Sequence, residues 1–321
     1  MGARVVGLTL VGLGGCALSV AVLVGTWLAA EPPVLALDES YRTEAVGQVT
    51  YLDPASLAVR TGNEVVVSVR VQGDAASGDA GDATAVWIAE SSTEDADGTL
   101  VATTTTVACL DRRSVEARGC AAASVDGSPV QLSGLVLAFP PGTPARDLDV
   151  WDGTTGQALP ARYAGTERFR GLEVLRFEQE VPEQVVRTVT VPGAITGGGA
   201  GFLSAEVVHR NSRTLLVEPV SGVVVRTEES PVTVLRGLDG AAGPVLLSGT
   251  LTTSEESAAD AVGRAQEVLD RQRLLGAVVP WTAGGSGAAL TVLGVLLVVR
   301  SRPAAAAQVE DEPARVPVPT A

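Results

Sequence analysis

The stretch LLVEPVSGVVVRTEE, from Leu215 to Glu229, runs apolar, breaks at an acid, a proline, a serine and a glycine, and then runs apolar again. An acid at the first position of a turn can accept hydrogen bonds from backbone N–H groups two residues on. Proline presets φ at the next position, and glycine supplies the left-handed exit of a short hairpin loop. The stretch therefore predicts a strand, a turn and a second strand, with Glu218, Pro219 and Gly222 as turn residues.

Three further segments share this pattern of an apolar residue, an acid, two turn-compatible residues and a hydroxyl, with their acids at Asp53, Asp111 and Asp152. The four acids are unevenly spaced, which argues against the fixed period of a propeller or solenoid. Stretches such as 67–72 and 172–180 alternate polar and apolar residues, as half-buried strands do. We expect residues 31–252 to form a mainly β domain, an antiparallel meander of hairpins folded as a curved sheet or a sandwich.

Two long uncharged runs flank this domain, at 5–30 and 274–299. Each has 26 residues, more than the ~20 that an α-helix needs to cross the hydrocarbon layer. Residues 1–30 are therefore expected to be an N-terminal transmembrane anchor, and residues 274–299 a second transmembrane helix. Thr253-Ser-Glu-Glu256 matches a capping box, and the apolar spacing after it predicts a helical stalk over 253–273.

The first run leaves two alternatives open. A secretory signal would begin with a similar short positive segment, but its apolar core spans only about 7 to 15 residues, which favours an uncleaved anchor. Leu13-Gly14-Gly15-Cys16 loosely resembles a lipoprotein processing site, which would make Cys16 a lipidated N-terminus. The apolar run continues for fourteen residues beyond Cys16, so an ordinary intramembrane cysteine is the favoured interpretation.

Arginines suggest the orientation of the two spans. Arg4 precedes the first, and Arg300 and Arg302 follow the second, which by the positive-inside tendency puts both termini in the cytoplasm of a two-pass cell-membrane protein. Residues 31–273 would then be extracytoplasmic, because a long domain is translocated largely regardless of its charge. The tail at 300–321, rich in alanine and proline, is expected to be disordered and cytoplasmic.

Two cysteines, Cys109 and Cys120, lie in the domain expected outside the cell. Paired thiols in an oxidising compartment usually form a disulfide, and this pair could join the two arms of a hairpin. A buried free pair is the alternative. A redox-active pair is disfavoured because the spacing is not Cys-x-x-Cys.

The charge and the scarcity of chemically active side chains restrict the function. Residues 31–273 contain 19 basic and 34 acidic residues, a net charge of −15 that would repel nucleic acid. His209 is the sole histidine and has no Gly-x-Ser-x-Gly elbow to accompany it, so we expect neither catalysis nor a zinc site. Asp95-Ala-Asp-Gly98 resembles part of a calcium loop but lacks the closing glutamate, so no metal and no cofactor is expected.

Several motifs together resemble those of the porin PorA family, membrane-anchored proteins of Gram-positive actinobacteria. They are Tyr51-Leu-Asp-Pro54, Asp111-Arg-Arg113, Gly134-Leu-Val-Leu-Ala-Phe-Pro140, Val150-Trp-Asp152, Tyr163-Ala-Gly-Thr-Glu167, Gly171-Leu-Glu-Val-Leu-Arg-Phe177 and Arg213-Thr-Leu-Leu-Val-Glu-Pro-Val-Ser-Gly222. The flanking spans and the helix before the second one match too. The resemblance implies an actinobacterial cell-envelope protein and supplies no catalytic residues.

These observations lead to three hypotheses. The leading one is a non-enzymatic, membrane-anchored protein whose extracytoplasmic β domain binds or organises envelope components. The alternatives are lipid or glycolipid binding and transfer in an apolar groove, and an oligomeric channel assembled through its glycine-rich spans. The partners expected are the lipid bilayer, envelope lipids or other envelope proteins, with a homo-oligomer as a further option. A pore through one chain is disfavoured, because a membrane barrel needs a lipid-facing apolar band around a closed ring of strands.

Overall fold

The computed structural model describes residues 2–28, 34–53, 55–195 and 201–301. The described chain divides into two compact units. One comprises the N-terminal residues up to Glu31 with those from Gln272 onward, and the other runs from Pro32 to Arg271. The tail expected to be disordered lies, from residue 302, outside the described residues.

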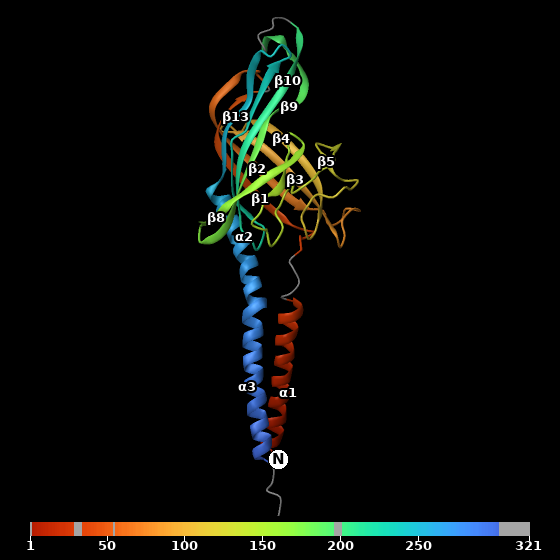
Figure 1. Cartoon of the computed structure of the whole chain (residues 1–321), viewed down its shortest axis with the longest axis vertical. Helices are drawn as coiled ribbons and strands as arrows, with labels where there is room; N and C mark the ends of the chain where they lie inside the picture. The colour runs from red at the N-terminus through yellow and green to blue at the C-terminus, as the bar shows by residue number, and fades with distance from the viewer. Residues whose placement is uncertain (1, 29–33, 54, 196–200, 302–321) are drawn as a thin grey trace, which may run out of the picture. The chain divides into compact units, whose positions relative to one another are not determined.

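The first unit is a pair of antiparallel helices, drawn in red and blue in Figure 1. Helix α1 spans Gly2–Leu23 and ends in a π-helical turn, Val24–Leu28. Helix α3 spans Val279–Arg300 and follows a second π-helical turn, Leu274–Val278, which Pro280 adjoins. Both helices are long and apolar enough to cross a membrane. They confirm the two long apolar helices predicted from the sequence.

The described residues of the second unit form a curved antiparallel sheet of thirteen strands, which confirms the mainly β prediction. Its strands are β1 Ser40–Leu52, β2 Val59–Gly73, β3 Thr84–Asp95, β4 Leu100–Asp111, β5 Ser124–Val125, β6 Ser128–Pro129, β7 Leu148–Asp152, β8 Gln157–Phe169, β9 Leu172–Pro192, β10 Phe202–Val217, β11 Val224–Glu229, β12 Val232–Gly237 and β13 Ala242–Thr253, with a 3₁₀ turn at Gly193–Ile195.

The strand order is more than a meander. Consecutive hairpins do place β1 to β6 and β7 to β10 in sequence order, but the last strand, β13, pairs with the first, β1. Isolated bridges then connect the remaining edges: Leu110 in β4 pairs with Ala117, Glu116 pairs with Leu135, and Leu135 pairs with Val150 in β7. The β4–β7 end of the sheet is therefore closed into a ring.

Beyond this ring the sheet is open. Strand β8 pairs with β9 only as far as Gln179, so the later part of β9, from Val181 to Pro192, has β10 as its neighbour on one side. Strand β10 pairs with β11 over Arg213–Val217 and with β12 over Ala205–Arg210. Its neighbour changes from β11 to β12 at Ser230–Pro231, the two residues between those strands. The two halves of β10 thus belong to a closed part and an open part of one sheet.

Helix α2, Glu255–Arg273, covers the closed part, where Ala261, Val262 and Ala265 pack against strands β9, β10 and β11. It begins two residues later than the sequence predicted. Ser257 N–H donates to Ser254 Oγ, whereas the Thr253 hydroxyl accepts from Thr227 N–H and so remains part of the sheet. Ser254 is therefore the residue that caps this helix.

Candidate functional site

The two helices of the first unit touch through glycine. A Cβ atom built on Gly7 would lie 2.8 Å from the Gly294 carbonyl oxygen, and one on Gly14 would lie 2.6 Å from that of Gly287. Only hydrogen fits at such distances, so the backbones approach as closely as small residues at membrane helix contacts permit. The glycines therefore explain how α1 and α3 form one compact unit.

The interior of the closed β part is filled by side chains. Phe177, which is fully buried, has its ring centroid 5.4 Å from that of Phe139 and 6.0 Å from that of Tyr163. Leu110 of β4 and Trp151 of β7 belong to the same cluster of buried residues. The space enclosed by this part of the sheet is thus a hydrophobic core.

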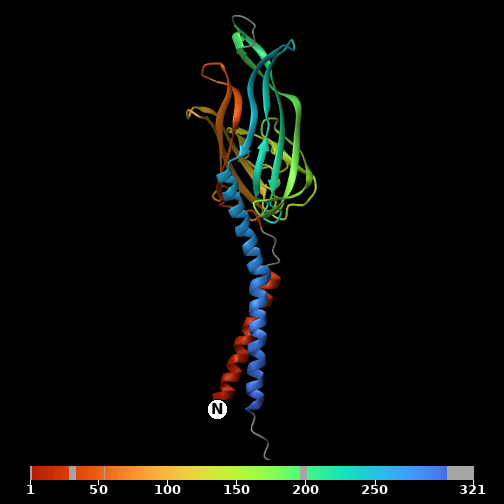
Figure 2. The ribbon, with the colours of Figure 1, turned by 90° about the vertical axis from the view of Figure 1, so that its left-hand side faces the viewer.

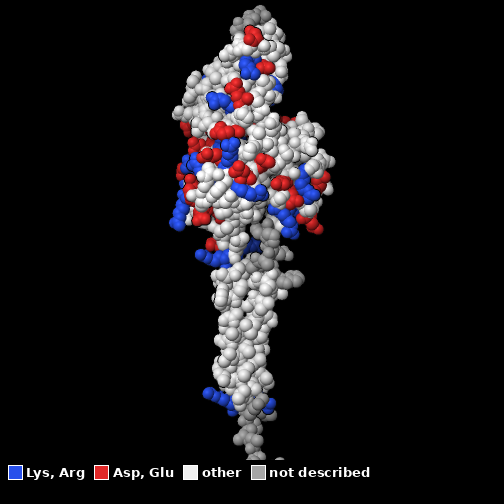
Figure 3. Space-filling model, in the orientation of Figure 1, with Lys and Arg blue, Asp and Glu red and all other residues white. Residues whose placement is uncertain are grey.

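The outer face of the sheet is charged. Along β9, Glu173, Glu178 and Glu180 are exposed and alternate with buried residues. Figure 3 shows acidic and basic groups scattered over the β unit, whereas the helix pair is uncharged along most of its length. The visible surface of the β unit thus carries charges of both signs.

The acids predicted in turns accept local hydrogen bonds. Asp53 accepts from the N–H groups of Ala55 and Ser56, and Asp111 from those of Arg113 and Ser114, at 2.8 to 3.3 Å. These bonds lower the pKa of Asp111 and, with the Ser56 hydroxyl and Arg60, hold that of Asp53 at about 2. Both carboxylates are therefore bound within their own turns.

The two other predicted acids lie deeper. Asp152 accepts from the Thr155 N–H at 2.8 Å and also meets the guanidinium of Arg213 at 3.6 Å. Glu218 is buried and accepts from the N–H groups of Val220 and Ser221 at 3.1 and 2.7 Å. Neither Asp152 nor Glu218 presents an unused carboxylate at the surface, since both are nearly fully buried.

The Glu218 turn is also a packing element. Thr143 N–H donates to the Pro219 carbonyl at 2.7 Å, and Gly222, with φ of +74°, leaves no room for a Cβ against the carbonyls of Phe139 and Pro140. The fifth residue of each predicted turn has a left-handed backbone. It is glycine at Gly156 and Gly222 but leucine at Leu57 and valine at Val115. Val115 is fully buried, and that burial offsets the strain of positive φ.

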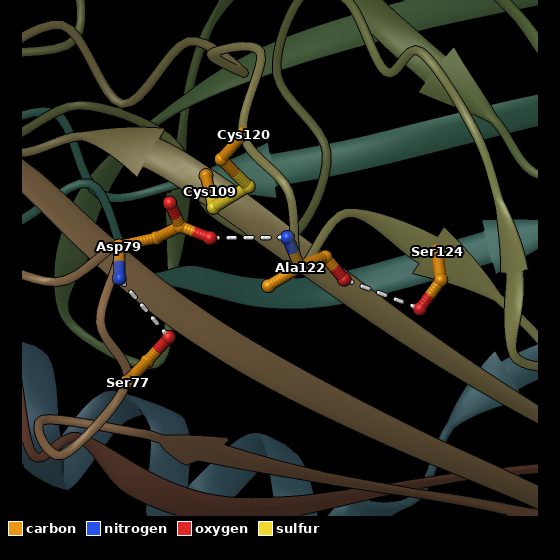
Figure 4. The surroundings of a disulfide bond; sticks show 6 residues. All are labelled: Ser77, Asp79, Cys109, Cys120, Ala122 and Ser124. Atoms are coloured by element: carbon orange, nitrogen blue, oxygen red, sulfur yellow. Dashed lines mark hydrogen bonds between the residues drawn. A yellow bond between two sulfur atoms is a disulfide. The ribbon is translucent and has the colours of Figure 1, made fainter.

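Cys109 and Cys120 form a disulfide, as the sequence favoured (Figure 4). The carboxylate of Asp79 lies beside it, and these three residues together have the donor atoms of a metal site within 4.8 Å of one another. Both sulfur atoms are bonded to each other, however, and Asp79 accepts from Ala122 N–H at 3.0 Å. The cluster therefore holds the segment after β4 to the Asp79 loop, and offers no thiolate to a metal.

In the acidic segment that resembles a calcium loop, the Asp95 carboxylate also accepts hydrogen bonds from the protein. Asp95 is buried, and its Oδ1 accepts from the N–H groups of Asp97 and Thr99 at 3.0 and 2.9 Å. Its Oδ2 accepts from the Tyr51 hydroxyl at 2.9 Å. These bonds lower the pKa of Asp95, and they make it the acid of a further turn.

Sequence reasoning missed a buried polar layer that crosses the interior beside the core. Three alternate residues of β10 contribute to it, namely His209, Asn211 and Arg213, between apolar Val207 and Leu215. Such a polar run at period two on a strand's inward face was the available signal. Arg213 donates to Glu229 at 3.1 Å and to Gln179 at 3.0 Å, so its charge is compensated.

Two atoms of this layer have no hydrogen-bond partner among the described residues, His209 Nε2 and Asn211 Oδ1. His209 Nδ1 is bonded to the Thr233 hydroxyl at 2.8 Å, and burial lowers the pKa of the imidazole. Asn211 also borders a surface groove of about 500 Å³, whose lining combines polar residues such as Glu180, Arg210 and Ser230 with Val181, Pro182 and Val232. Burial thus favours the neutral form of the histidine in this layer.

The described chain thus combines a filled antiparallel β unit with a pair of apolar, closely packed helices that are long enough to cross a membrane. The family model described as Porin PorA matches residues 6–296, nearly the whole chain, and the chain belongs to that family. This confirms the resemblance found in the motifs.

Other comparisons add little. No curated protein matches the chain. A putative MaoC domain protein dehydratase from Chloroflexus aurantiacus J-10-fl is similar at 12% identity, over 78% of this chain and 90% of its own, with a TM-score of 0.16. An N-terminal dehydratase from the difficidin assembly line is 11% identical over 71% and 82%, with a TM-score of 0.10. Such low scores carry no argument about fold or activity.

Proposed function

We propose that this protein is a non-enzymatic component of the cell envelope, in which a two-pass helical anchor carries a β domain that binds or organises other envelope components. The single observation that supports this most is the filled interior around Phe177. A domain whose interior is a packed core offers its outer surface, edges and ends to partners. The acids at 53, 111, 152 and 218 serve local structure, which agrees with a binding role.

The topology belongs to the same proposal. Both termini would be cytoplasmic and residues 31–273 extracytoplasmic, with the helical stalk ahead of the second span. Arg4 and Arg300 at the ends of the helix pair support this orientation. The Cys109–Cys120 disulfide supports an oxidising compartment for the β domain.

Lipid or glycolipid transfer is the second candidate and needs an apolar groove. The groove beside Asn211 is lined by carboxylates, hydroxyls and an arginine as well as by Val181, Pro182 and Val232, so it is not continuously apolar. A channel is suggested by the family's description, but the closed ring is occupied by Phe139, Phe177 and Trp151. A conducting assembly would therefore have to form between chains, through the helix pairs.

Mass spectrometry of the purified, detergent-exchanged full chain tests this proposal. We expect no stoichiometric lipid, and lipid retained at close to one molecule per chain would establish the carrier instead. Topology is read by labelling single cysteines in a Cys16→Ser background, since Cys109 and Cys120 are bonded to each other. Ser128→Cys should react in intact cells, whereas Gly2→Cys and Ser301→Cys should react only after permeabilisation. Labelling of either terminus from outside would refute the topology.

A further inference from the structure

Two neighbouring hairpins expose large apolar side chains at their ends. Phe202, at the start of β10, is 75% exposed, and Leu203 beside it is 43% exposed. Leu238, in the turn between β12 and β13, is 65% exposed. We call these three residues the apolar tip. Their strands pair directly, since Ala205 of β10 lies opposite Gly237 of β12.

The apolar tip rests on its own small core. Ala205, Val207 and Leu235 are buried beneath it, and Val191 and Ile195 pack against them. Leu203 and Phe202 lie opposite Val191 and Pro192 in the ladder with β9. The exposed side chains are thus held on paired strands with a core beneath them, so their exposure is a feature of the folded sheet.

Charge is sparse around the tip although the domain carries a net charge of −15. Residues 188–195 and 201–205 contain no charged residue, and residues 237–253 contain only Asp239. Towards the body of the sheet the first charged residues are Arg236 and Glu206, which are in contact at 2.9 Å, followed by the exposed Arg187. Figure 3 shows fewer charged atoms at this end of the β unit than across its middle.

The tip lies at the far end of the β unit from α2. Strand β9 runs for 21 residues from Leu172, which contacts α2, to Pro192 at the tip, a path of roughly 65 Å at ~3.3 Å per residue. Ser257, in the first turn of α2, accepts a hydrogen bond from Glu44 N–H of β1. Two turns later, Arg264 lies over the ring of Tyr41, which is nearer the start of β1. Helix α2 therefore leads away from the tip, and Figure 2 shows the same order within the β unit.

The size and chemistry of the tip select its occupant. A stable protein–protein interface takes about 20–30 residues on each side, far more than the three that form the tip. A lipid layer has no such minimum, because single apolar side chains gain by entering it. The acidic domain would be repelled by anionic headgroups, whereas the tip, whose turn carries Asp239 as its one charged residue, suits neutral lipid.

We propose that Phe202, Leu203 and Leu238 insert into the surface of a neutral lipid layer other than the one that α1 and α3 cross. The proposal rests on the membrane-anchored function proposed above, and it specifies a partner for it. The protein would then contact a second apolar layer besides the one that its helices cross.

The test uses full-length protein reconstituted into phosphatidylcholine vesicles with the β domain outward. Protein-free acceptor vesicles, made with brominated phosphatidylcholine that quenches tryptophan, are then added. We expect Phe202→Trp to lose emission on mixing. Leu100→Trp is the matched control, since Leu100 is 53% exposed on the separate β3–β4 hairpin, and its emission should not change. Adding Leu203→Ser and Leu238→Ser to Phe202→Trp should abolish the quenching.

Each other outcome has one meaning. Equal quenching of the Leu100 and Phe202 variants, or none in the Phe202 variant, would overturn the lipid contact. Donor vesicles that cluster without acceptor quenching would identify a second copy of the chain as the partner, which also overturns it. Flotation of the donor vesicles in alkaline carbonate, measured in parallel, reports helix insertion, so failure of the anchor is distinguished from failure of the tip.

Discussion

Replacing Phe177 with alanine probes the filled interior directly. The side chain is fully buried, and its ring lies 5.4 and 6.0 Å from two other aromatic rings. Burial of a phenylalanine contributes about 1.5–3 kcal/mol by transfer alone. The cavity left behind and the lost ring contacts bring the expected cost to about 3–5 kcal/mol. This corresponds to a change of roughly two to nearly four orders of magnitude in the unfolding constant of the β domain.

The same substitution at an exposed position gives the control. Phe202 is also a phenylalanine on a strand but is 75% exposed, so Phe202→Ala should change the free energy of unfolding by less than about 0.5 kcal/mol. Denaturant titration of both full-length variants in the same detergent, followed by near-ultraviolet circular dichroism, measures the difference. A cost below about 1 kcal/mol for Phe177→Ala would mean that the interior around this ring is not packed.

Three further predictions concern other parts of the chain. In a Cys16→Ser background, Ala21→Cys and Gly284→Cys should form a disulfide, since a Cβ on Gly284 lies 3.7 Å from that of Ala21. Adding Gly14→Leu should lower the yield of this disulfide. Adding Gly15→Leu should not, because a Cβ on Gly15 has nothing within 4 Å. Reducing the Cys109–Cys120 bond, which closes a loop of 11 residues, should lower the free energy of unfolding by about 2–3 kcal/mol, and a thermal midpoint unchanged by reductant would contradict this. Because the pKa of Asp53 is held at about 2 in the folded state, its ionised form stabilises the fold above the ordinary carboxyl pKa; the stability advantage of wild type over Asp53→Asn should shrink as the pH falls from about 4 to 2, and a constant difference would remove this role.

The sequence was most informative where short-range patterns determine structure. Alternation along 172–180 predicted a strand, and the uncharged runs predicted the two apolar helices, because periodicity and composition act over a few turns or residues. The four acids were located in turns by local chemistry alone. Pro54, part of the first of these motifs, lies outside the described residues.

The pairing of strands that are distant in the sequence was not predicted. The contact of β13 with β1 joins segments about two hundred residues apart, and the single bridges through Leu135 that close the ring have no pattern of their own. Left-handed Val115 could not be inferred, since a β-branched residue at positive φ is held by burial that only the tertiary structure supplies. The polar layer at His209, Asn211 and Arg213 was visible as a polar run, but its partners come from distant strands.

We propose that the β domain is a packed, anchored binding domain that encloses neither a pore nor a lipid. Planar-bilayer recording with the purified full-length chain tests the pore most directly. We predict no conductance steps above those of protein-free bilayers, either for wild type or for Phe177→Ala. Reproducible steps in wild type whose size increases in Phe177→Ala would place an ion pathway through the interior and contradict the claim.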